Sequence, residues 1–440
     1  MPATTAIVGL GVTGLSAARH LAAASSDELV VIDTRAAPPG LSELLSSDPA
    51  AELRLGQAKP SFKGVDRAVV SPGMALDDPA LADARKRGIE LTSDIELFLA
   101  SAEAPVVAVT GTNGKSTVTA LVGDMLSHAG LDVGVGGNIG VAALDLLGAE
   151  RDAYVLELSS FQLERLRHVG ARAATILNVS DDHMDRYAGF ADYVAAKQRV
   201  YRGVGTAVTN RADAATTPSA SVPEQVTFGL DAPDAGGYGV TGQGEAVRLH
   251  LADFEFAACE LALPGRHNQA NAQAATALAL QVGANRAAVE ASLASFAGLP
   301  HRCQRVAVKD EVVFVNDSKA TNVGAALAAI QGLAGERDLI LIAGGEGKGA
   351  DFAPLADAMV GTVALAVLIG RDAALIEAAL AGRVPVQHAE SMADAVAVAA
   401  RAAKPGQTVL LAPACASFDQ FDSYTQRGDV FTASVRELAA

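Results

Sequence analysis

The chain alternates short β-branched apolar runs with segments whose apolar residues recur at helical spacing. Strands are predicted at residues 5–9, 28–33, 67–73, 106–109, 153–157, 312–318, 338–345, 364–370 and 408–414, and helices at 15–24, 118–125, 190–201 and 263–280. Alternating strands and helices are typical of parallel sheets covered by helices. The pattern therefore predicts an α/β protein, with domains at residues 1–94, 95–297 and 298–440.

Residues 110–117 form a candidate phosphate loop between the strand at 106–109 and the helix at 118–125. Glycines let backbone amides approach an anion, a lysine reaches the outer phosphates, and a hydroxyl can bind Mg²⁺. The match to G-x-x-x-x-G-K-[ST] is incomplete, because Val109 occupies the first glycine position. An ordinary strand–turn–helix corner is the alternative, but the order of residue types favours a nucleoside triphosphate site, comprising Gly111, Thr112, Asn113, Gly114, Lys115, Ser116 and Thr117.

Composition and charge narrow the possible partners of the 440-residue chain. Half of the residues are hydrophobic and 19% are charged, which is typical of a globular protein. The net charge of −16 argues against a nucleic-acid or membrane partner. Three cysteines far apart indicate a reducing compartment without disulfides or a zinc cluster. With no signal peptide and no apolar run long enough to span a bilayer, we expect a cytoplasmic protein.

The N-terminal segment carries a second glycine motif, which does not by itself identify the ligand. Gly9, Gly11 and Gly14 have G-x-G-x-x-G spacing after a strand, and Asp33 ends the next strand about 20 residues later. This motif predicts a Rossmann-like fold, but on its own it leaves a nicotinamide cofactor open. A dehydrogenase would leave the lysine loop unexplained, whereas a simple phosphate-loop switch protein would not need the flanking α/β segments.

Polar residues at the ends of two further strands are metal-ligand candidates. Glu157 ends an apolar strand, and a cluster of Asp181, Asp182, His183 and Asp185 follows another. The carboxylate of Glu157 is suited to Mg²⁺, although a strand-end glutamate or, for the cluster, a helix N-cap is the structural alternative. Lys197 lies in the helix at 190–201, where periodicity alone favours a solvated lysine.

Seven stretches in order resemble the Mur ligase family. They are GTNGKST (111–117), LELSSFQL (156–163), DDHMDRY (181–187), GRHNQANAQAA (265–275), PHR (300–302), NDSKATN (316–322) and ACASFDQF (414–421). The resemblance covers essentially the whole chain. It implies a Rossmann-like N-terminal domain, a central ATPase domain of the P-loop type and a C-terminal Rossmann-like amino-acid-binding domain.

The resemblance implies an ATP-dependent, Mg²⁺-using ligase that joins D-glutamate to UDP-N-acetylmuramoyl-L-alanine and acts as a monomer. The N-terminal glycines would then receive the uridine diphosphate part of the substrate, not NAD. The implied nucleotide-sugar residues are Leu15, Ser16, Asp33, Thr34, Arg35, Ser71, Gly73 and Asn138. ATP would be bound by the phosphate loop together with Asn268, Asn271, Arg302 and Asp317.

The remaining implied residues concern the amino acid, the metal and catalysis. D-Glutamate would contact Thr321, Lys348, Ser417, Phe418 and Tyr424, with tyrosine at a position where the family pattern has phenylalanine. The implied metal ligands are Ser116, Thr117, Glu157, His183 and a carbamoylated Lys197, and the implied catalytic residues are Lys115, His183, Lys197 and Lys319. A carbamate would replace the cation of Lys197 with an anionic oxygen ligand. The implied chemistry is phosphorylation of the L-alanine carboxylate, followed by attack of the D-glutamate amine.

Overall fold

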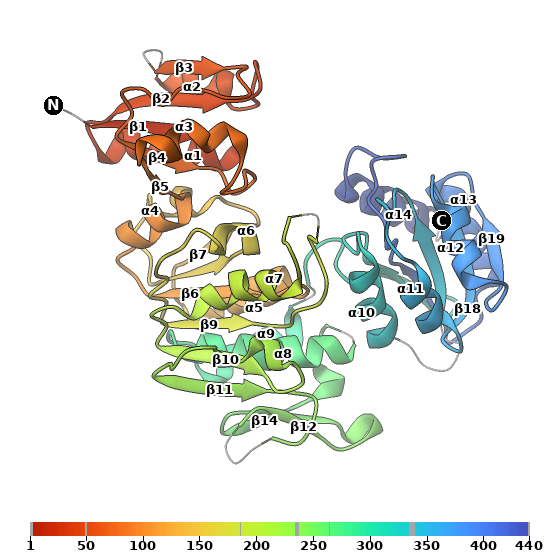
Figure 1. The fold of residues 1–440 in the computed structure, drawn as a ribbon. Helices are drawn as coiled ribbons and strands as arrows, with labels where there is room; N and C mark the ends of the chain where they lie inside the picture. The colour runs from red at the N-terminus through yellow and green to blue at the C-terminus, as the bar shows by residue number, and fades with distance from the viewer. Residues whose placement is uncertain are drawn as a thin grey trace. The chain divides into compact units, whose positions relative to one another are not determined.

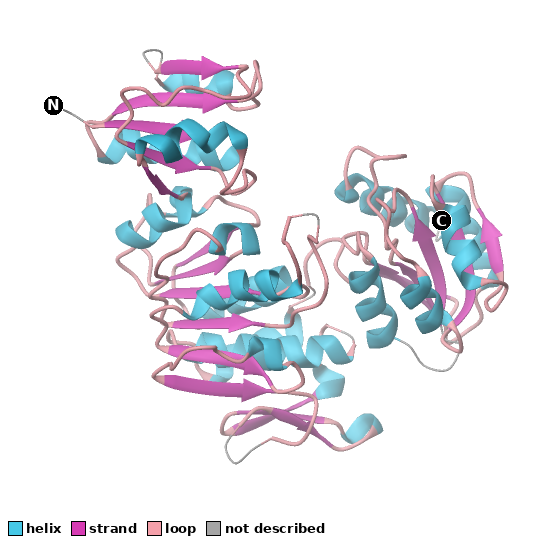
Figure 2. Cartoon of the chain, viewed as in Figure 1, coloured by secondary structure: helices cyan, strands magenta, loops and turns pink. Residues whose placement is uncertain are grey.

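The computed structural model describes residues 3–48, 51–184, 186–233, 237–263, 265–296, 298–333 and 339–438. The chain forms two compact units (Figure 1). The first contains Met1–Gly229, Pro233–Tyr238 and Ala274–Val289, and the second contains Leu230–Ala232, Gly239–Gln273 and Glu290–Ala440. Strands alternate with helices through most of the chain (Figure 2), and the predicted α/β fold is confirmed.

The first sheet is parallel, with strand order β3-β2-β1-β4-β5. Its strands are β1 (Thr4–Val8), β2 (Glu28–Asp33), β3 (Glu52–Leu55), β4 (Arg67–Val70) and β5 (Glu90–Thr92), and its helices are α1 (Val12–Ala24), α2 (Leu41–Ser47), α3 (Ala82–Arg87) and α4 (Asp94–Ser101). Gly14 is needed where α1 passes β1, because a Cβ there would lie 2.0 Å from the carbonyl oxygen of Gly9. The strand order reverses at β1, which places a ligand crevice beside the glycine turn.

The second sheet is also parallel, with strand order β11-β10-β9-β6-β8-β7. Its strands are β6 (Val106–Thr110), β7 (Val133–Gly137), β8 (Ala153–Glu157), β9 (Ala173–Ile176), β10 (Thr206–Asn210) and β11 (Glu224–Phe228), and its helices are α5 (Lys115–His128), α6 (Ser160–Leu163) and α7 (Phe190–Gln198). One apolar core joins residues of both sheets, including Ile7 of β1 and Leu156 of β8.

A small antiparallel sheet and two helices follow in the chain. The strands are β12 (Gly239–Thr241), β13 (Arg248–Leu251) and β14 (Phe254–Ala257), and the helices are α8 (Arg266–Leu280) and α9 (Arg286–Ser295). The short turns η1–η6 connect other elements: η1 (Pro79–Leu81), η2 (Ala143–Leu146), η3 (Arg199–Tyr201), η4 (Ala214–Thr216), η5 (Gly244–Ala246) and η6 (Ala258–Glu260). The predicted domain boundary at residue 297 falls outside the described residues, so it stays a prediction, as does the boundary at 94.

The last sheet has strand order β15-β16-β20-β17-β18-β19, with only the β15–β16 pair antiparallel. Its strands are β15 (Gln304–Lys309), β16 (Val312–Asn316), β17 (Leu339–Gly344), β18 (Val363–Ile369), β19 (Val386–His388) and β20 (Thr408–Leu411), and its helices are α10 (Val323–Leu333), α11 (Ala353–Met359), α12 (Ala373–Leu380), α13 (Met392–Ala402) and α14 (Tyr424–Leu438).

Helices cover both faces of this last sheet. Leu341 of β17 packs in one core with α10, α11 and α12, whereas its neighbours Ile340 and Ile342 pack in another core with α13 and α14. This alternation follows from the two-residue period of a strand, and burial on both faces explains why β17 is apolar at every position. Among the described residues, none of the helices has both the length and the apolarity to cross a membrane.

Candidate active site

The phosphate loop connects β6 to α5, and two positions in it require glycine. Gly111 has φ 149°, and a Cβ there would press against Leu177 at 3.1 Å. Gly114 has φ 82° directly before the first residue of α5, Lys115. Asn178, beyond β9, fixes the loop by accepting hydrogen bonds from the amides of Thr112 (2.8 Å, at its carbonyl) and Asn113 (2.9 Å, at its side chain). The helix N-terminus and the rigid loop form a site suited to an anion.

Two lysine side chains meet at the carbonyl oxygen of Gly111. Lys115 Nζ donates to it at 2.8 Å and to the carbonyl oxygen of Thr112 at 2.7 Å, while Lys197 Nζ donates to Gly111 at 2.8 Å. Lys197 is 1% exposed, and its Nζ lies 4.4 Å from the ring centroid of Tyr193. The prediction of a solvated Lys197 from periodicity is therefore wrong, because α7 turns this side chain onto the loop rather than toward water.

The environment of Lys197 disfavours its charged form. Burial and the nearby charge of Lys115 hold the pKa of Lys197 well below its usual range, against the opposing effect of Asp182 and Glu157. A lysine in this environment is unprotonated far more often than a surface lysine. An unprotonated amine is a nucleophile, which is the chemical state that reaction with CO₂ requires.

Glu157 ends β8 beside the phosphate loop, 2% exposed. Its Oε2 accepts a hydrogen bond from Ser116 Oγ, and its Oε1 accepts one from Asn138 Nδ2 at 2.7 Å. Thr117, the next residue of α5, is also buried. These contacts bring together oxygen atoms from the loop and from the neighbouring strand, as the sequence predicted for Ser116 and Glu157. No cluster of at least three His, Cys, Asp or Glu side chains is placed to hold a metal within the described parts of the chain.

His183 lies in the loop between β9 and α7 and has φ 57°, a conformation unusual for a non-glycine residue. Its ring packs 4.7 Å from the ring of Phe161, and its Nε2 is 3.7 Å from Asp182 Oδ2. Tyr193 of α7 lies at 6.4 Å from the same ring. His183 is thus an exposed imidazole that packs against aromatic rings. The fourth member of the predicted cluster, Asp185, lies outside the described residues.

Most of the predicted nucleotide-sugar residues lie after β2 and β4 and in α1, which follows β1. Asp33 is buried and accepts hydrogen bonds from the amide of Leu10 at 2.8 Å and from the Arg35 guanidinium at 2.7 and 2.9 Å. Burial raises the pKa of Asp33, but the hydrogen bonds from Arg35 and Leu10 outweigh it, and the net shift is downward. Asp33 therefore joins the glycine turn to the following loop, where Thr34 and Arg35 are exposed.

The other residues of this set differ in how accessible they are. Leu15 and Ser16 are buried in α1, and Ser16 Oγ has no hydrogen-bond partner among the described residues. A buried hydroxyl without a partner is rare and needs an explanation. Asn138 is exposed beyond β7, and Ser71 and Gly73 lie in the turn after β4.

The second unit contains the other four predicted ATP residues. Asn268 and Asn271 are buried in the first turns of α8, where Asn271 Nδ2 donates to Asn268 Oδ1 at 3.0 Å. Asp317 follows β16 and accepts a hydrogen bond from the amide of Cys303 at 3.2 Å. Burial raises the pKa of Asp317 to about 6. Arg302 is half-buried in the turn before β15.

The predicted amino-acid residues of the second unit form cation–aromatic pairs. Lys319 Nζ lies 3.9 Å from the ring centroid of Tyr424, and Lys348 Nζ lies 5.5 Å from that of Phe418. Phe418 is 64% exposed, while Ser417 beside it is buried. The Lys319 and Lys348 cations lie on loops after β16 and β17, at the same edge of the sheet. Thr321 is in the loop of Lys319, and its amide donates to the Lys319 carbonyl at 2.8 Å.

Sequence reasoning missed Arg427, which holds these loops together. Arg427 of α14 is 1% exposed and donates to Ser318 Oγ at 3.0 Å and to the carbonyl oxygens of Ser318 (2.8 Å), Cys415 (3.1 Å) and Ala416 (3.3 Å). Burial lowers its pKa to about 10. No local pattern distinguishes this arginine from a surface one, because its partners lie about 10 and 110 residues away in sequence.

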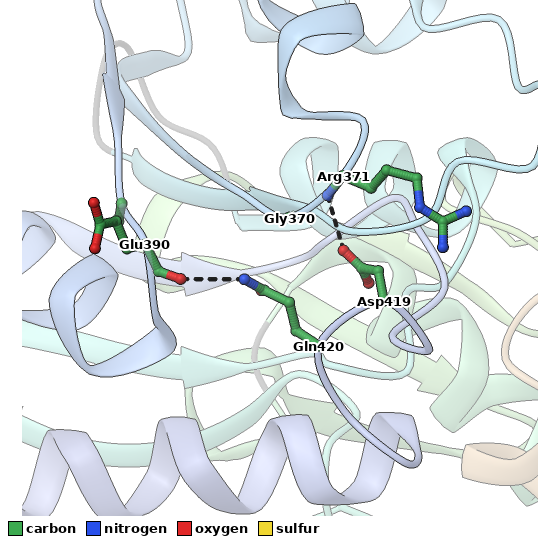
Figure 3. A pocket seen from close by; sticks show the side chains of 6 residues that line it. Gly370, Arg371, Glu390, Asp419 and Gln420 are labelled. Atoms are coloured by element: carbon green, nitrogen blue, oxygen red, sulfur yellow. Dashed lines mark hydrogen bonds between the residues drawn. The ribbon is translucent and has the colours of Figure 1, made fainter.

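A pocket of about 470 Å³ opens at the carboxyl ends of β18 and β19 (Figure 3). It is lined by Gly370, Arg371, Ala389, Glu390, Asp419 and Gln420. Asp419 accepts a hydrogen bond from the Arg371 amide at 2.9 Å, and Gln420 donates to the Glu390 carbonyl at 3.1 Å. These bonds connect the loop of Ser417 and Phe418 to the ends of two strands.

Models of three Mur ligase domains match the chain in order. The Mur ligase MurD-like N-terminal domain matches residues 3–93, the Mur ligase middle domain matches 109–279, and the Mur ligase glutamate ligase domain matches 301–415. Together they match well over half of the chain, and they agree with the predicted three-domain α/β architecture.

Curated relatives and solved structures are similar along nearly the full length. UDP-N-acetylmuramoylalanine–D-glutamate ligase of Marinobacter nauticus is 48% identical over 439 residues, covering 99% of this chain and 98% of the relative. The ligase of the same name from Pseudomonas aeruginosa is 47% identical, covering 98% of both chains. The solved UDP-N-acetylmuramate-alanine ligase of Thermotoga maritima has a TM-score of 0.61 at 19% identity and covers 99% of both chains, which shows a shared fold.

Proposed function

The chain belongs to the Mur ligase family, and we propose that it is the ATP-dependent ligase that joins D-glutamate to UDP-N-acetylmuramoyl-L-alanine, a step in peptidoglycan precursor synthesis. One observation carries the enzymatic part of the proposal. Ser116 donates a hydrogen bond to Glu157, and Lys115, the residue before it, holds its cation on the phosphate loop at the Gly111 carbonyl, so the loop combines a cation, a hydroxyl and a carboxylate suited to a triphosphate. The relatives at 47–48% identity support the choice of D-glutamate.

The reaction needs activation, because a carboxylate oxygen is a poor leaving group. An oxygen of the L-alanine carboxylate attacks the γ-phosphorus of ATP, the bond to the β–γ bridging oxygen breaks, and an acyl phosphate and ADP form. Lys115 and the loop amides hold the phosphates and stabilise the charge that accumulates on the transferred group. The unprotonated amine of D-glutamate then attacks the acyl carbon, and phosphate leaves with the bridging oxygen.

The residues beside the loop fit Mg²⁺. Oxygen atoms of Ser116 and Glu157 lie together in a buried position, and oxygen is the ligand type that Mg²⁺ prefers. We propose Thr117, His183 and a carbamoylated Lys197 as further members of this site. When bound, the ion would neutralise charge on the phosphate oxygens.

Carbamoylation of Lys197 is supported by its position. The carbamate nitrogen would retain one N–H, which is the number needed for the observed hydrogen bond to Gly111. The added carboxylate would be attracted to the cation of Lys115, which donates to the same oxygen. The modification thus turns an unfavourable buried amine into an anionic ligand beside the phosphate loop.

The remaining substrate contacts are proposed by motif. The nucleotide sugar would contact Leu15, Ser16, Asp33, Thr34, Arg35, Ser71, Gly73 and Asn138; the nucleotide would contact Asn268, Asn271, Arg302 and Asp317; and the amino acid would contact Lys319, Thr321, Lys348, Ser417, Phe418 and Tyr424. We propose domains at 1–94, 95–297 and 298–440, a monomeric enzyme, and a cytoplasmic location where ATP is supplied. Nucleic acid and membrane are not among the proposed partners, in keeping with the net charge of −16.

Phosphate release measured against a panel of D- and L-amino acids tests the function. We expect release from ATP only when UDP-N-acetylmuramoyl-L-alanine and D-glutamate are both present. Release without an amino acid would instead indicate a nucleotide switch protein. Quenching of NADH fluorescence without any ligase activity would indicate a dehydrogenase, and either result would overturn the proposal.

A further inference from the structure

The turn at residues 71–74 is held by two arginines that come from the connections of the second sheet. All four of its carbonyl oxygens accept a hydrogen bond from the guanidinium of Arg165 or Arg186. Arg165 follows α6, Arg186 precedes α7, and the turn follows β4 of the first sheet. The three segments belong to one compact unit. The two guanidinium groups thus bind four successive carbonyl groups and stabilise this conformation of the turn.

Arg165 occupies its place at a cost to the fold. Arg165 is 9% exposed, and its Nη2 donates to the carbonyl oxygens of Ser71 (3.4 Å) and Met74. Within the described chain, its Nε and Nη1 have no hydrogen-bond partner, and neither has Oδ1 of the buried Asp94, which interacts with Arg165 electrostatically. Burial lowers the pKa of the Arg165 guanidinium. Buried polar groups that lack hydrogen-bond partners oppose folding. Their presence at this position therefore indicates a role other than stabilising the fold.

Arg186 connects the same turn to His183. It donates to the carbonyl oxygens of Gly73 at 3.3 Å and of Met74 at 3.2 Å, and it forms a largely buried ion pair with Glu164. Its guanidinium lies 4.4 Å from the ring centroid of Phe161, and the ring of Phe161 in turn packs against His183. The Arg186 amide also donates to the His183 carbonyl at 2.9 Å. The turn and His183 are therefore joined through one side chain and its backbone.

We propose that Arg165 and Arg186 are positioning residues that clamp the turn at 71–74, so that Ser71 and Gly73 hold the sugar of the nucleotide substrate at a fixed distance from His183 and the phosphate loop. The inference rests on the proposed function, since it needs a bound nucleotide-sugar substrate that extends from the first sheet to the second. Neither arginine touches the reacting atoms. The clamp is expected to affect binding of the nucleotide sugar and leave ATP binding unchanged, because it lies on the turn and not on the phosphate loop.

The test compares Arg186→Lys and Arg165→Gln with the matched control Arg167→Met. Arg167 lies in the same segment, but its side chain pairs with Glu90 at the surface, where the two are 71% and 60% exposed. For Arg186→Lys we expect the KM of UDP-N-acetylmuramoyl-L-alanine to rise about tenfold and the KM of ATP to stay within about twofold, since a displaced substrate is the defect. Calorimetric titration of the nucleotide sugar alone should show the same loss, and Arg167→Met should match the unmodified enzyme.

The outcomes separate the clamp from the function on which it rests. An unmodified protein without ligase turnover would refute the proposed function. An active enzyme whose Arg186→Lys variant behaves like Arg167→Met would refute the clamp alone. A similar rise in the KM values of UDP-N-acetylmuramoyl-L-alanine, ATP and D-glutamate, with a lower melting temperature, would show a merely structural role and would also refute the clamp. If Arg165→Gln does not fold, Arg186→Lys decides, because it keeps the charge next to Glu164.

Discussion

Replacing Lys197 with methionine should separate catalytic need from structural need. The substitution removes the hydrogen bond from Nζ to Gly111, about 0.5–1.5 kcal/mol for an uncharged N–H donor, and the packing of the side chain on the Tyr193 ring. It also removes the cost of burying a polar group, about 1–3 kcal/mol. Because these contributions oppose each other, we expect a net change within about 2 kcal/mol, roughly 4–8 °C in melting temperature at most.

Turnover should respond very differently from stability. If Lys197 supplies an anionic ligand at the phosphate loop, Lys197→Met should lose at least about 100-fold in kcat, which is about 2.7 kcal/mol of transition-state stabilisation. Ala195→Met, on the exposed face of the same helix, is the control and should have normal turnover. A short carboxylate such as formate should partly restore Lys197→Met, because it can occupy the space of the missing carbamate.

The dependence on CO₂ gives the sign of the pH effect. Only the unprotonated amine captures CO₂, and a lysine with the usual pKa of 10.5 is about 0.1% unprotonated near pH 7.5. Since burial lowers the pKa of Lys197, recovery of CO₂-depleted enzyme at a fixed concentration of dissolved CO₂ should be measurable at neutral pH and faster as the pH rises toward that lowered pKa. Full turnover of Lys197→Met would refute any catalytic role. An inactive Lys197→Met beside a wild type indifferent to CO₂ would refute the carbamate.

Three further substitutions test other parts of the site. Lys115→Ala should lower kcat by about 10³-fold with the melting temperature nearly unchanged, because a phosphate contact is lost; normal kcat would reject that role. Asp317 has a folded pKa near 6, above its unfolded value of 3.8, so its ionisation costs stability as the pH rises from 4 to 6. Asp317→Asn should therefore be more stable than the wild type at pH 7 by up to about 3 kcal/mol, yet bind ATP more weakly. Melting curves of the variant that match those of the wild type at both pH 5 and pH 7.5 would contradict this. Gly14→Ala should cost about 1–3 kcal/mol and weaken nucleotide-sugar binding, since its Cβ would meet the Gly9 carbonyl at 2.0 Å; a normal melting temperature would contradict the close packing.

Local patterns predicted most of the fold. The β-branched run at 106–109 and the glycines after it predicted both β6 and the turn into α5, because strand periodicity and positive φ leave direct traces in sequence. The same holds for β1 and its glycine turn. Strand order left no such trace, since β20 inserts between β16 and β17 although it is the last strand in the chain.

Side-chain environments that depend on distant contacts were not predictable from periodicity. Lys197 has the spacing of a surface residue, and only the packing of α7 on the Gly111 loop, 86 residues away, shows that it is buried. Arg165 and Arg427 also look like surface arginines in sequence, yet both donate to backbone carbonyls of remote loops. The closeness of Ser116 and Glu157 was predictable, because Glu157 ends β8 and Ser116 follows the loop after the adjacent parallel strand β6, at the same edge of the sheet.

The central claim is that the chain activates the L-alanine carboxylate by phosphorylation, and isotope transfer tests it most directly. UDP-N-acetylmuramoyl-L-alanine would carry ¹⁸O in both oxygens of its carboxylate, and the phosphate released in the presence of ATP and D-glutamate would be analysed by mass spectrometry. An acyl phosphate passes one labelled oxygen to each phosphate released and leaves the other in the new amide. Unlabelled phosphate accompanying a formed amide would contradict this mechanism.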